Sequence, residues 1–532
     1  DRSVSRGLGD VYKRQSLFLP LFSSCSLDRE PYGLNNLWSS EENAQKALDA
    51  AYVPLYEEEG FGEGHWWAGL LSDDMVINRE DAAMGQLSNF TAVTNTYWAM
   101  YDNWKVMYKV IRRANDVLAN VPNIEMAESK KRIMLGEANY LCAFSYFFLA
   151  KRYGGLPFYD YNNPTEFNKP RETKEQTYKN IETYLLNAIE YFRDIDGQPL
   201  WERTSDDWGR PNLGAAYGLL AKVYAHWGKM DKCKEMAWEV INSGKYSLEK
   251  ANDNGFDYLF SPAGEKSNEV LFNLTQLPER HKCSIISVVP MSSSLTGGTG
   301  WFYFAPTQSL RDAFKEGDLR RKTTVAQDGD EYSWIGKTFV LKTNPTEQDR
   351  QEIEAEGKTL GNINDMTTGY MCVKYANAYS TMSGWVWEPG ADVPLLRYSD
   401  VLLLYVEALM NEKGLNSSNR DAMTSDATIL KYFNEVHERA FAQTPGYDHK
   451  DQINFMDLVN ERRCELAYED ERHYDLVRWE MAKEVYAQGN SPRNFDPAKH
   501  RHMPLPQSEI ENSNGVLINN PAPGYSDFGN AQ

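Results

Sequence analysis

Two pairs of carboxylates in the chain have the residue types and the spacing that acid–base chemistry needs. Glycoside hydrolysis, for example, uses two carboxyl groups on either side of the scissile bond. Glu461 and Glu465 are four residues apart and would share one face of a helix, and Asp73 and Asp74 are adjacent. Arginines surround the two glutamates in the sequence, so ion pairing explains them better than catalysis does. The sequence therefore favours a structural or hydrogen-bonding role for both pairs, and a glycoside hydrolase is the least favoured function.

Other signatures of catalysis are missing from the sequence. The chain contains no G-x-S-x-G, no H-E-x-x-H, no P-loop and no dinucleotide fingerprint. The glycine-rich segment 296–300 is followed by no basic residue that could meet a phosphate. His473 beside Asp470 and Glu471 could suggest a metal site, but the neighbouring arginines predict an ion-pair network instead. We therefore expect no enzyme activity, no cofactor and no metal ion.

Aromatic side chains are the stronger signal, since they make up 13 % of the residues. Sugars have flat C–H faces that pack on aromatic rings, and hydroxyl groups that need polar partners beside those rings. We predict a sugar-binding surface with aromatic contacts from Trp66, Trp67, Trp98, Trp301, Tyr303, Trp385 and Trp387. Hydrogen bonds to the sugar are expected from Asp73, Arg79 and Asn95. Ordinary packing of these rings within loops is the alternative interpretation.

One helix-forming segment must hold charged groups inside the protein. Arg397, Asp400 and Glu407 fall within about a quarter of a helix circumference, and the residues around them in 394–409 are mostly apolar. A helix that is apolar on nearly all sides is buried, so its charged stripe needs partners inside the protein. Residues 461–479 carry many charges of both signs. We predict two packed helices joined by internal ion pairs.

The chain from about residue 36 to residue 320 has a mainly helical pattern. Apolar residues recur at steps of three and four in 134–148 and in 213–227, and glycines follow these runs at Gly154 and Gly228. Paired helices of this size suggest TPR-like hairpins. The further amphipathic segments are 97–118, 171–192 and 231–241.

Two later segments, 290–305 and 367–390, have no helical period and are rich in glycine, serine, threonine and aromatic residues. Loops held by a rigid scaffold often carry binding surfaces. We therefore expect a large, loop-rich insertion at about 250–393 to contribute to the ligand site.

The first 25 residues resemble processing and cloning sequence more than a folded element. Residues 1–15 resemble translated sequencing-adapter sequence, with a genuine disordered tail as the alternative, and we leave them out of the fold. Residues 16–24 form a short apolar run with two small residues before Cys25, which resembles the end of a lipoprotein signal peptide. We predict that the mature chain begins at Cys25 and carries a lipid anchor there.

The overall charge and the cysteines exclude several classes of protein. The formal net charge is −20, which argues against nucleic acid or an anionic membrane surface as a partner. A neutral ligand such as a sugar is compatible with this charge. Apart from Cys25, the cysteines are scattered without C-x-x-C spacing, so they predict neither a disulfide framework nor a zinc site.

Several of these segments together resemble the SusD/RagB family. The resemblance is carried at the C-terminal end by 397–408, 433–440, 461–479 and 503–510 followed by 519–521, and earlier in the chain by 137–157, 209–228, 241–248 and 268–272. His437 stands where the family usually has an arginine. Members of this family are outer-membrane lipoproteins that capture nutrients, mostly glycans.

The resemblance implies a fold and a role for the whole chain from Cys25 onward. We expect one body, 25–532, that is dominated by α-helices: four TPR-like helix pairs in a right-handed stack, at about 40–250 and 394–485, with the insertion between them. The implied role is non-catalytic glycan capture at the cell surface and delivery to a SusC-like TonB-dependent transporter of the outer membrane. A TPR-type scaffold that binds peptides or proteins, or a relative that captures peptides, is the alternative.

Overall fold

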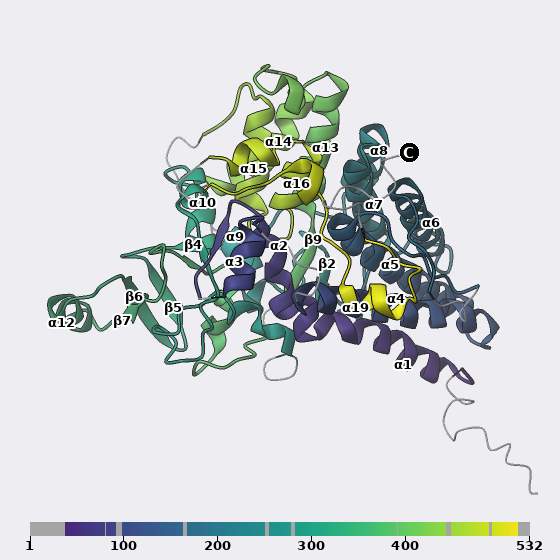
Figure 1. Cartoon of the computed structure of the whole chain (residues 1–532), viewed down its shortest axis with the longest axis horizontal. Helices are drawn as coiled ribbons and strands as arrows, with labels where there is room; N and C mark the ends of the chain where they lie inside the picture. Colours follow the sequence, from purple (N-terminus) through teal and green to yellow (C-terminus); the bar gives the residue numbers. More distant parts are fainter. Residues whose placement is uncertain are drawn as a thin grey trace, which may run out of the picture.

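The computed structural model describes residues 38–79, 81–91, 98–162, 168–250, 255–277, 282–390, 392–442, 448–488 and 492–519. Helices dominate this part of the chain, which confirms the predicted fold class (Figure 1). The α-helices are α1 Glu41–Tyr52, α2 Trp66–Leu71, α3 Ala82–Ser88, α4 Trp98–Asn120, α5 Glu128–Tyr153, α6 Lys174–Phe192, α7 Leu213–Trp227, α8 Met230–Asn242, α9 Gly255–Leu259, α10 Gln308–Ala313, α11 Arg320–Thr324, α12 Glu347–Ala355, α13 Tyr398–Glu412, α14 Ala427–Ala440, α15 Phe455–Glu465, α16 Arg472–Arg478, α17 Ala482–Tyr486, α18 Pro497–His500 and α19 Gln507–Asn512. The predicted leader and Cys25 lie outside the described residues, as does Asn95.

The long helices of the first half of the chain pack in sequence order. Helix α4 packs on α5, α5 on α6, α6 on α7 and α7 on α8, and α1 lies along α4. Figure 1 shows this group on the right of the molecule, with α1 below it. Helix α8 also packs on α13, although the insertion separates the two in sequence. The grouping of these helices into four TPR-like pairs with a right-handed stack stays a prediction.

Glycines end two of these helices, as the sequence predicts. Helix α5 ends at Tyr153 and Gly154 follows with φ +76°. Helix α7 ends at Trp227 and Gly228 follows in the left-handed region, with φ +79°. A residue with a Cβ is strained at such φ values, so glycine is the residue that ends the helix there with least cost.

Helix α5 is the core of the helical group. It is, among the described residues, the helix whose length and composition would allow it to cross a membrane. However, 94 % of its apolar window is buried inside the protein, where it contacts α1, α4, α6 and α7. Every residue from Met134 to Tyr153 is buried. This environment is that of a core helix, and the apolar composition of α5 follows from its burial on all sides.

The strands are short and join parts of the chain that are far apart in sequence. They are β1 Met75–Ile77, β2 Val270–Leu274, β3 Phe304–Pro306, β4 Val325–Ala326, β5 Glu331–Trp334, β6 Lys337–Lys342, β7 Thr359–Asn362, β8 Met371–Cys372 and β9 Val393–Arg397. β1 pairs antiparallel with β3, so the N-terminal part of the chain holds the insertion. β2 pairs antiparallel with β9, which brings the two ends of the insertion together.

The insertion also contains regular structure of its own. β5 and β6 form an antiparallel hairpin, and β6 pairs in parallel with β7 after the crossover through α12. Figure 1 shows β5, β6, β7 and α12 projecting from the left of the molecule. Helix α12 begins with a reciprocal capping box between Thr346 and Asp349. The segment that we expected to be irregular is therefore a mixture of loops, short helices and small sheets.

The predicted internal ion pairs are present between α13 and the helices after it. Arg462 Nη1 lies 2.8 Å from Asp400 Oδ1, Arg478 Nη1 lies 2.5 Å from Glu407 Oε1, and both pairs are buried. One detail of the prediction is wrong: Arg397 is not in the helix. It is the last residue of β9, with an extended backbone at φ −121° and ψ 155°, and α13 begins at the next residue. From the end of this strand the Arg397 side chain reaches α15, where its Nη1 lies 2.8 Å from Glu465 Oε1.

Candidate functional site

The Glu461–Glu465 pair lies in an ion-pair network and not in a catalytic cleft. Glu465 is fully buried and accepts from Arg320 and Arg397 at 3.1 and 2.8 Å and from Arg439. Burial alone would raise the pKa of the Glu465 carboxyl, but these arginines hold it well below its ordinary range. A glycosidase acid needs a raised pKa, so this carboxylate is suited to ion pairing and not to proton donation.

Glu461 lies in the same network, where it contacts Arg320 and His437. Arg320 Nη1 lies 2.6 Å from Glu461 Oε1, and His437 Nδ1 lies 2.7 Å from Oε2 of the same carboxylate. Burial would raise the pKa of Glu461, and Arg320 and His437 reverse the shift. His437 thus keeps a polar contact with the Glu461 carboxylate.

Asp73 and Asp74 are likewise held by arginines. Arg472 Nε lies 2.9 Å from Asp73 Oδ1, and Arg463 Nη2 lies 3.0 Å from Asp73 Oδ2. Arg463 Nε donates to Asp74 Oδ1 at 2.7 Å. Burial would raise the pKa of Asp73, but Arg472 and Arg463 hold it well below its usual value. Both oxygens of Asp73 already have guanidinium partners, so the surface described below does not include this residue.

His473 does not join Asp470 and Glu471 in a metal cluster. Its Nδ1 lies 2.9 Å from the Tyr486 hydroxyl, and burial lowers its pKa to about 3. Asp470 pairs with Arg152 at 2.8 Å and Glu471 pairs with Lys151 at 3.2 Å. The predicted ion-pair network around these residues is confirmed.

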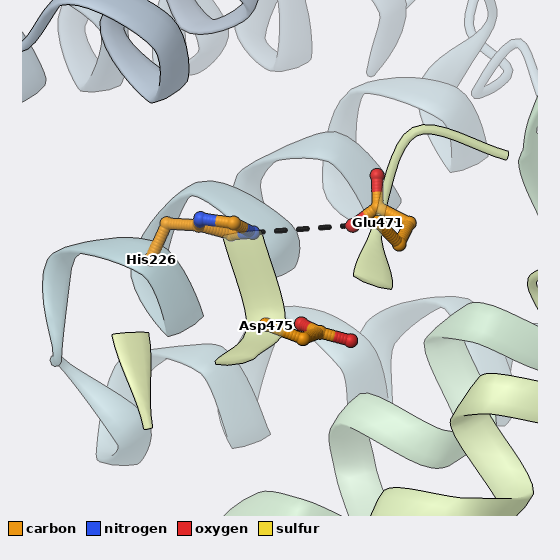
Figure 2. Close-up of side chains that lie close together, drawn as sticks. All are labelled: His226, Glu471 and Asp475. Atoms are coloured by element: carbon orange, nitrogen blue, oxygen red, sulfur yellow. Dashed lines mark ion pairs between the residues drawn. The ribbon is translucent and has the colours of Figure 1, made fainter. Parts of the chain in front are cut away.

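A different histidine lies close to two carboxylates inside the protein. Figure 2 shows His226 of α7 beside Glu471 and Asp475, with His226 Nε2 3.9 Å from Glu471 Oε2. One ligand atom from each of the three side chains lies within 4.8 Å of the other two. Such a group could in principle hold a metal ion.

The surrounding charges make this group a poor cation site. Four cationic side chains already neutralise the two carboxylates, each within 3.2 Å of one of them. Burial, followed by Arg478 and the two lysines, lowers the pKa of His226 well below its ordinary value. The four cationic side chains are Lys151 and Lys222 at Glu471, and Arg462 and Arg478 at Asp475. All four would repel a further cation.

Three of the predicted aromatic residues, all from the insertion, lie together at the surface beside Arg79, which follows β1. Trp387 is 58 % exposed, and its ring stands at 82° to the ring of Trp301 with the centroids 5.8 Å apart. The ring of Tyr303 follows at 6.0 Å from that of Trp301, and the Arg79 guanidinium lies over Tyr303 at 4.8 Å from its centroid. We call Arg79, Trp301, Tyr303 and Trp387 the aromatic surface.

Backbone contacts at the end of the β1–β3 sheet hold this surface in place. Asn78 N and Arg79 N donate to the carbonyl oxygen of Tyr303 at 2.8 and 3.4 Å. The Asn78 side chain donates to the carbonyl oxygens of Phe302 and Asp365 at 2.9 and 2.8 Å. Phe302 itself has φ +45°, an unusual value for a residue with a Cβ, and it lies between the two surface rings. Such local strain is tolerated where the surrounding structure holds the chain firmly.

Two of the predicted aromatic residues pack into the protein, Trp66 completely and Trp385 in part. Trp66 is 1 % exposed, and its Nε1 donates to the carbonyl oxygen of Ile286 at 3.1 Å. Trp385 packs against Tyr379 and Phe339, with centroid distances of 4.9 and 5.7 Å. For Trp66 the alternative of ordinary packing is correct, because a ring with no exposed face cannot take a sugar.

The remaining predicted aromatic residues are placed only by their backbone. Trp67 lies in α2 and Trp98 begins α4. Their side chains lie outside the described part of the structure. Their contribution to a ligand site stays a prediction, as does that of Asn95.

Sequence reasoning missed a buried glutamate beside the aromatic surface. Glu63 is 7 % exposed, and its Oε1 is buried with no hydrogen-bond partner among the described residues. Burial raises its pKa to about 7, and Glu58 and Glu59 add to this shift. Tyr303 is close enough for Glu63 to raise its pKa also, after burial. In the sequence, Glu63 follows an acidic run. This run has no helical or strand period, so the burial of Glu63 could not be predicted from it.

Comparison with known proteins identifies the family. Residues 239–525 match the family described as the SusD family, and residues 27–225 match one described as "Starch-binding associating with outer membrane". The first match covers more than half of the chain. The chain belongs to the SusD family, and the second description associates its N-terminal part with the outer membrane.

Individual relatives agree with this assignment over nearly the full length. SusD-like protein P2 of Formosa agariphila is 25 % identical, over 96 % of this chain and 98 % of its own. A SusD-like protein of Bacteroides ovatus is 26 % identical, over 86 % of this chain and 80 % of its own. Among solved structures, surface glycan-binding protein A from Bacteroides thetaiotaomicron in complex with laminarihexaose superposes with a TM-score of 0.71 at 21 % identity, over 91 % of this chain and 100 % of that one. This solved structure shares the fold of the chain.

Proposed function

We propose that this protein captures a glycan without cleaving it, and that the aromatic surface is where the glycan binds. The observation that carries the proposal is Trp387, a tryptophan that is 58 % exposed and stands at 82° to Trp301. Exposing such a ring to water costs free energy unless a ligand covers it. The arginine over Tyr303 supplies hydrogen-bond donors beside the rings, which sugar hydroxyls need.

Two further observations support binding without catalysis. The carboxylate pairs of the chain, Glu461–Glu465 and Asp73–Asp74, are engaged by buried arginines. In addition, relatives of the same fold are described as a laminarin-binding SusD-like protein and as surface glycan-binding proteins. Laminarin is therefore the first glycan to test with this chain.

The proposal includes a location and a partner that follow from family membership. We place the protein at the cell surface, held in the outer membrane by a lipid on Cys25. There it would sit over a SusC-like TonB-dependent transporter and pass the glycan into it. Membrane fractionation of the Cys25→Ser variant, and co-purification of the wild type with a SusC-like transporter from outer-membrane extracts, test these two points separately.

Affinity electrophoresis with a panel of polysaccharides, including laminarin, tests the glycan site. We expect one polysaccharide to retard the wild-type protein, and Trp387→Ala and Trp301→Ala to bind about tenfold or more weakly, which corresponds to ~1.4 kcal/mol. Trp238→Ala is the matched control. Trp238 is 40 % exposed but lies on α8 and stacks on Tyr405, away from the aromatic surface.

Three outcomes would point elsewhere. Equal loss of binding in Trp238→Ala and Trp387→Ala would mean that the glycan does not bind at the aromatic surface. Release of shorter sugars from a bound polysaccharide would favour the glycoside hydrolase. Retention of peptides, with no retardation by any glycan, would favour a peptide-binding scaffold or a peptide-capturing relative.

A further inference from the structure

A cavity of about 490 Å³ opens near the other end of the β1–β3 sheet. Its walls come from the end of β1, the start of α10 and the helices α15, α16 and α17. Three arginines line its buried part, namely Arg463, Arg472 and Arg493, each less than 10 % exposed. The exposed side chains at its mouth are Gln308, Ser309 and Gln488. We call this cavity the arginine pocket.

Two of the three arginines are only partly used by their carboxylate partners. Arg463 and Arg472 reach Asp73 and Asp74 through their Nε and Nη2 atoms. Arg472 Nη1 is buried and has no hydrogen-bond partner among the described residues. A guanidinium carries five N–H donors and no acceptor, so these side chains retain donors for an anion.

Arg493 has no carboxylate partner within ion-pair distance among the described residues. Its Nη1 donates to the carbonyl oxygen of Leu70 at 2.8 Å, and its Nη2 donates to that of Met75. Burial lowers the pKa of Arg493, and Tyr486, Asp73 and Asp74 oppose the shift only in part. A buried guanidinium without its own counter-ion is costly, and an anionic ligand would supply the missing charge.

The charges that face the pocket leave it positive within an acidic protein. The charged side chains that line it are three arginines and Asp73, and Asp74 lies behind Arg463. His473, next to Arg472, is neutral at physiological pH because its pKa is about 3. The chain as a whole carries a formal net charge of −20. The net negative charge of the protein repels anions at long range. An anion that binds in the pocket is therefore held by the local arginines and not by the field of the whole protein.

From this arrangement we propose that the arginine pocket binds an oxyanion substituent of the captured glycan, either a sulfate ester or a uronic acid carboxylate. Guanidinium groups match the geometry of both. The inference rests on the proposed glycan capture and specifies the class of glycan, namely one with anionic substituents. Its sugar rings would bind at the aromatic surface.

The sheet places the pocket within reach of the aromatic surface. Val76 lines the pocket, and three residues further on Arg79 belongs to the aromatic surface. On the partner strand, Thr307 lines the pocket and Tyr303 is four residues away, about 13 Å of extended chain. Thr367 N donates to Asn78 Oδ1 at 2.6 Å, and the next residue, Thr368, lines the pocket too. One oligosaccharide could therefore contact both.

The field along the sheet would orient such a ligand. At the aromatic end, burial and the carboxylates of Glu63, Asp81 and Glu58 raise the pKa of Tyr303, opposed by Arg79 alone. At the other end the arginines predominate. The arginines would therefore hold the anionic substituent at their end of the sheet, which leaves the sugar rings for the aromatic end.

Isothermal titration calorimetry of the intact mature chain with sodium sulfate and with sodium glucuronate tests the pocket without a glycan. Sodium chloride at the same ionic strength is the reference. We expect saturable binding of at least one anion, which Arg493→Gln abolishes. Gln308→Glu adds one negative charge at the mouth and removes no hydrogen bond that the structure records, so it should weaken binding at least about threefold. Gln198→Glu, an exposed change in the turn after α6, is the matched control and should leave binding unchanged.

The two anions distinguish the two sources of charge, and the variants decide the proposal. Binding of sulfate alone points to a sulfated glycan, and binding of glucuronate alone points to a uronic acid. Absence of binding for both anions, or binding that Gln308→Glu leaves unchanged, overturns the proposal even if Arg493→Gln does not fold. Failure of glycan capture shows separately, because Trp387→Ala would then have no effect on any polysaccharide while the free anions still bind.

Discussion

The C-terminal ion-pair network and the aromatic surface use side chains in opposite ways. In the network, Arg397 is 1 % exposed and binds Glu269, Glu465 and Glu469, so charges satisfy one another away from water. At the aromatic surface, Trp387 is 58 % exposed and contacts one other ring at its edge. Arg397 and these three glutamates use their charges on one another, and they hold the fold together. The exposed ring of Trp387, in contrast, is open to a ligand.

Acid should break the network more completely than any single substitution. Burial would raise the pKa values of Glu461, Glu465 and Glu469, but arginines and other partners hold them below the ordinary value. A carboxyl with a lowered folded-state pKa stabilises the protein above its unfolded pKa, and this stability is lost as the pH falls through the folded value. We therefore expect the unfolding temperature to fall steeply below about pH 4.5. A flat profile between pH 5 and pH 3 in calorimetry would contradict this view of the network.

Arg397→Ala should be the most damaging single change. It leaves Glu269, Glu465 and Glu469 buried with fewer cations, and removing one partner of a buried pair costs about 3–5 kcal/mol. Urea denaturation measures the loss. The control is Lys234→Ala, which removes an exposed pair with Glu412 and should cost less than about 1 kcal/mol. Equal costs for the two variants would show that burial does not decide the strength of these pairs.

Glu63→Gln should sharpen the contrast, because the pKa of Glu63 is shifted in the direction opposite to the pKa values of the network glutamates. Burial and the neighbouring Glu58 and Glu59 raise its pKa to about 7. A raised folded-state pKa gives stability that is fully present below the unfolded value of about 4.5 and is lost as the pH rises through 7. The free energy of unfolding of the wild type should therefore fall by at most about 3 kcal/mol between pH 5 and pH 8, and Glu63→Gln should not show this fall.

Thermal unfolding across this pH range is the measurement for Glu63. Burial also raises the pKa of Asp392 to about 7, so Asp392→Asn is the companion variant that separates the two contributions. If wild type and Glu63→Gln have the same slope of unfolding temperature against pH, Glu63 is already ionised in the folded protein at pH 5.

Trp387→Ala should have the smallest effect on stability and yet a large effect on glycan binding. An exposed ring loses little contact with the protein, so its removal should change the free energy of unfolding by no more than about 0.5 kcal/mol. Trp66→Ala, which empties a buried site, should cost about 3–5 kcal/mol. A large loss of stability in Trp387→Ala would mean that the aromatic surface is part of the core, and any loss of binding would need another explanation.

The sequence predicted elements whose signal is local. The glycines at 154 and 228 end helices where the apolar period stops, and the charged stripe of α13 has partners in 461–479 because buried charges must be paired. Exposure could not be predicted in this way. Trp385 and Trp387 are two residues apart and lie in one loop, but the first is partly buried against Tyr379 and the second is mostly exposed. That difference depends on neighbours contributed by other segments.

The arginine pocket shows the same limit. Arg463 and Arg472 lie in segments that the sequence marked as charged and paired, while Arg493 stands in a loop with no period. Only the folded chain shows that all three line one cavity and that Arg493 lacks a carboxylate. Likewise, the extended backbone of Arg397 follows from its pairing with Val270 across the β2–β9 sheet, which no local pattern shows.

That same β2–β9 pair makes the insertion tolerant of change. Because Val270–Leu274 and Val393–Arg397 are held together, residues 275–392 form a loop whose ends the frame has already joined. The entropy of closing a loop grows only with the logarithm of its length, so doubling the segment would cost only about 0.6 kcal/mol. The loops that carry Trp301, Tyr303 and Trp387 can therefore change in length at little cost in loop-closure entropy, so the three rings of the aromatic surface can vary within one contiguous piece of the gene. Arg320 lies in the same segment and must keep its place beside Glu461 and Glu465.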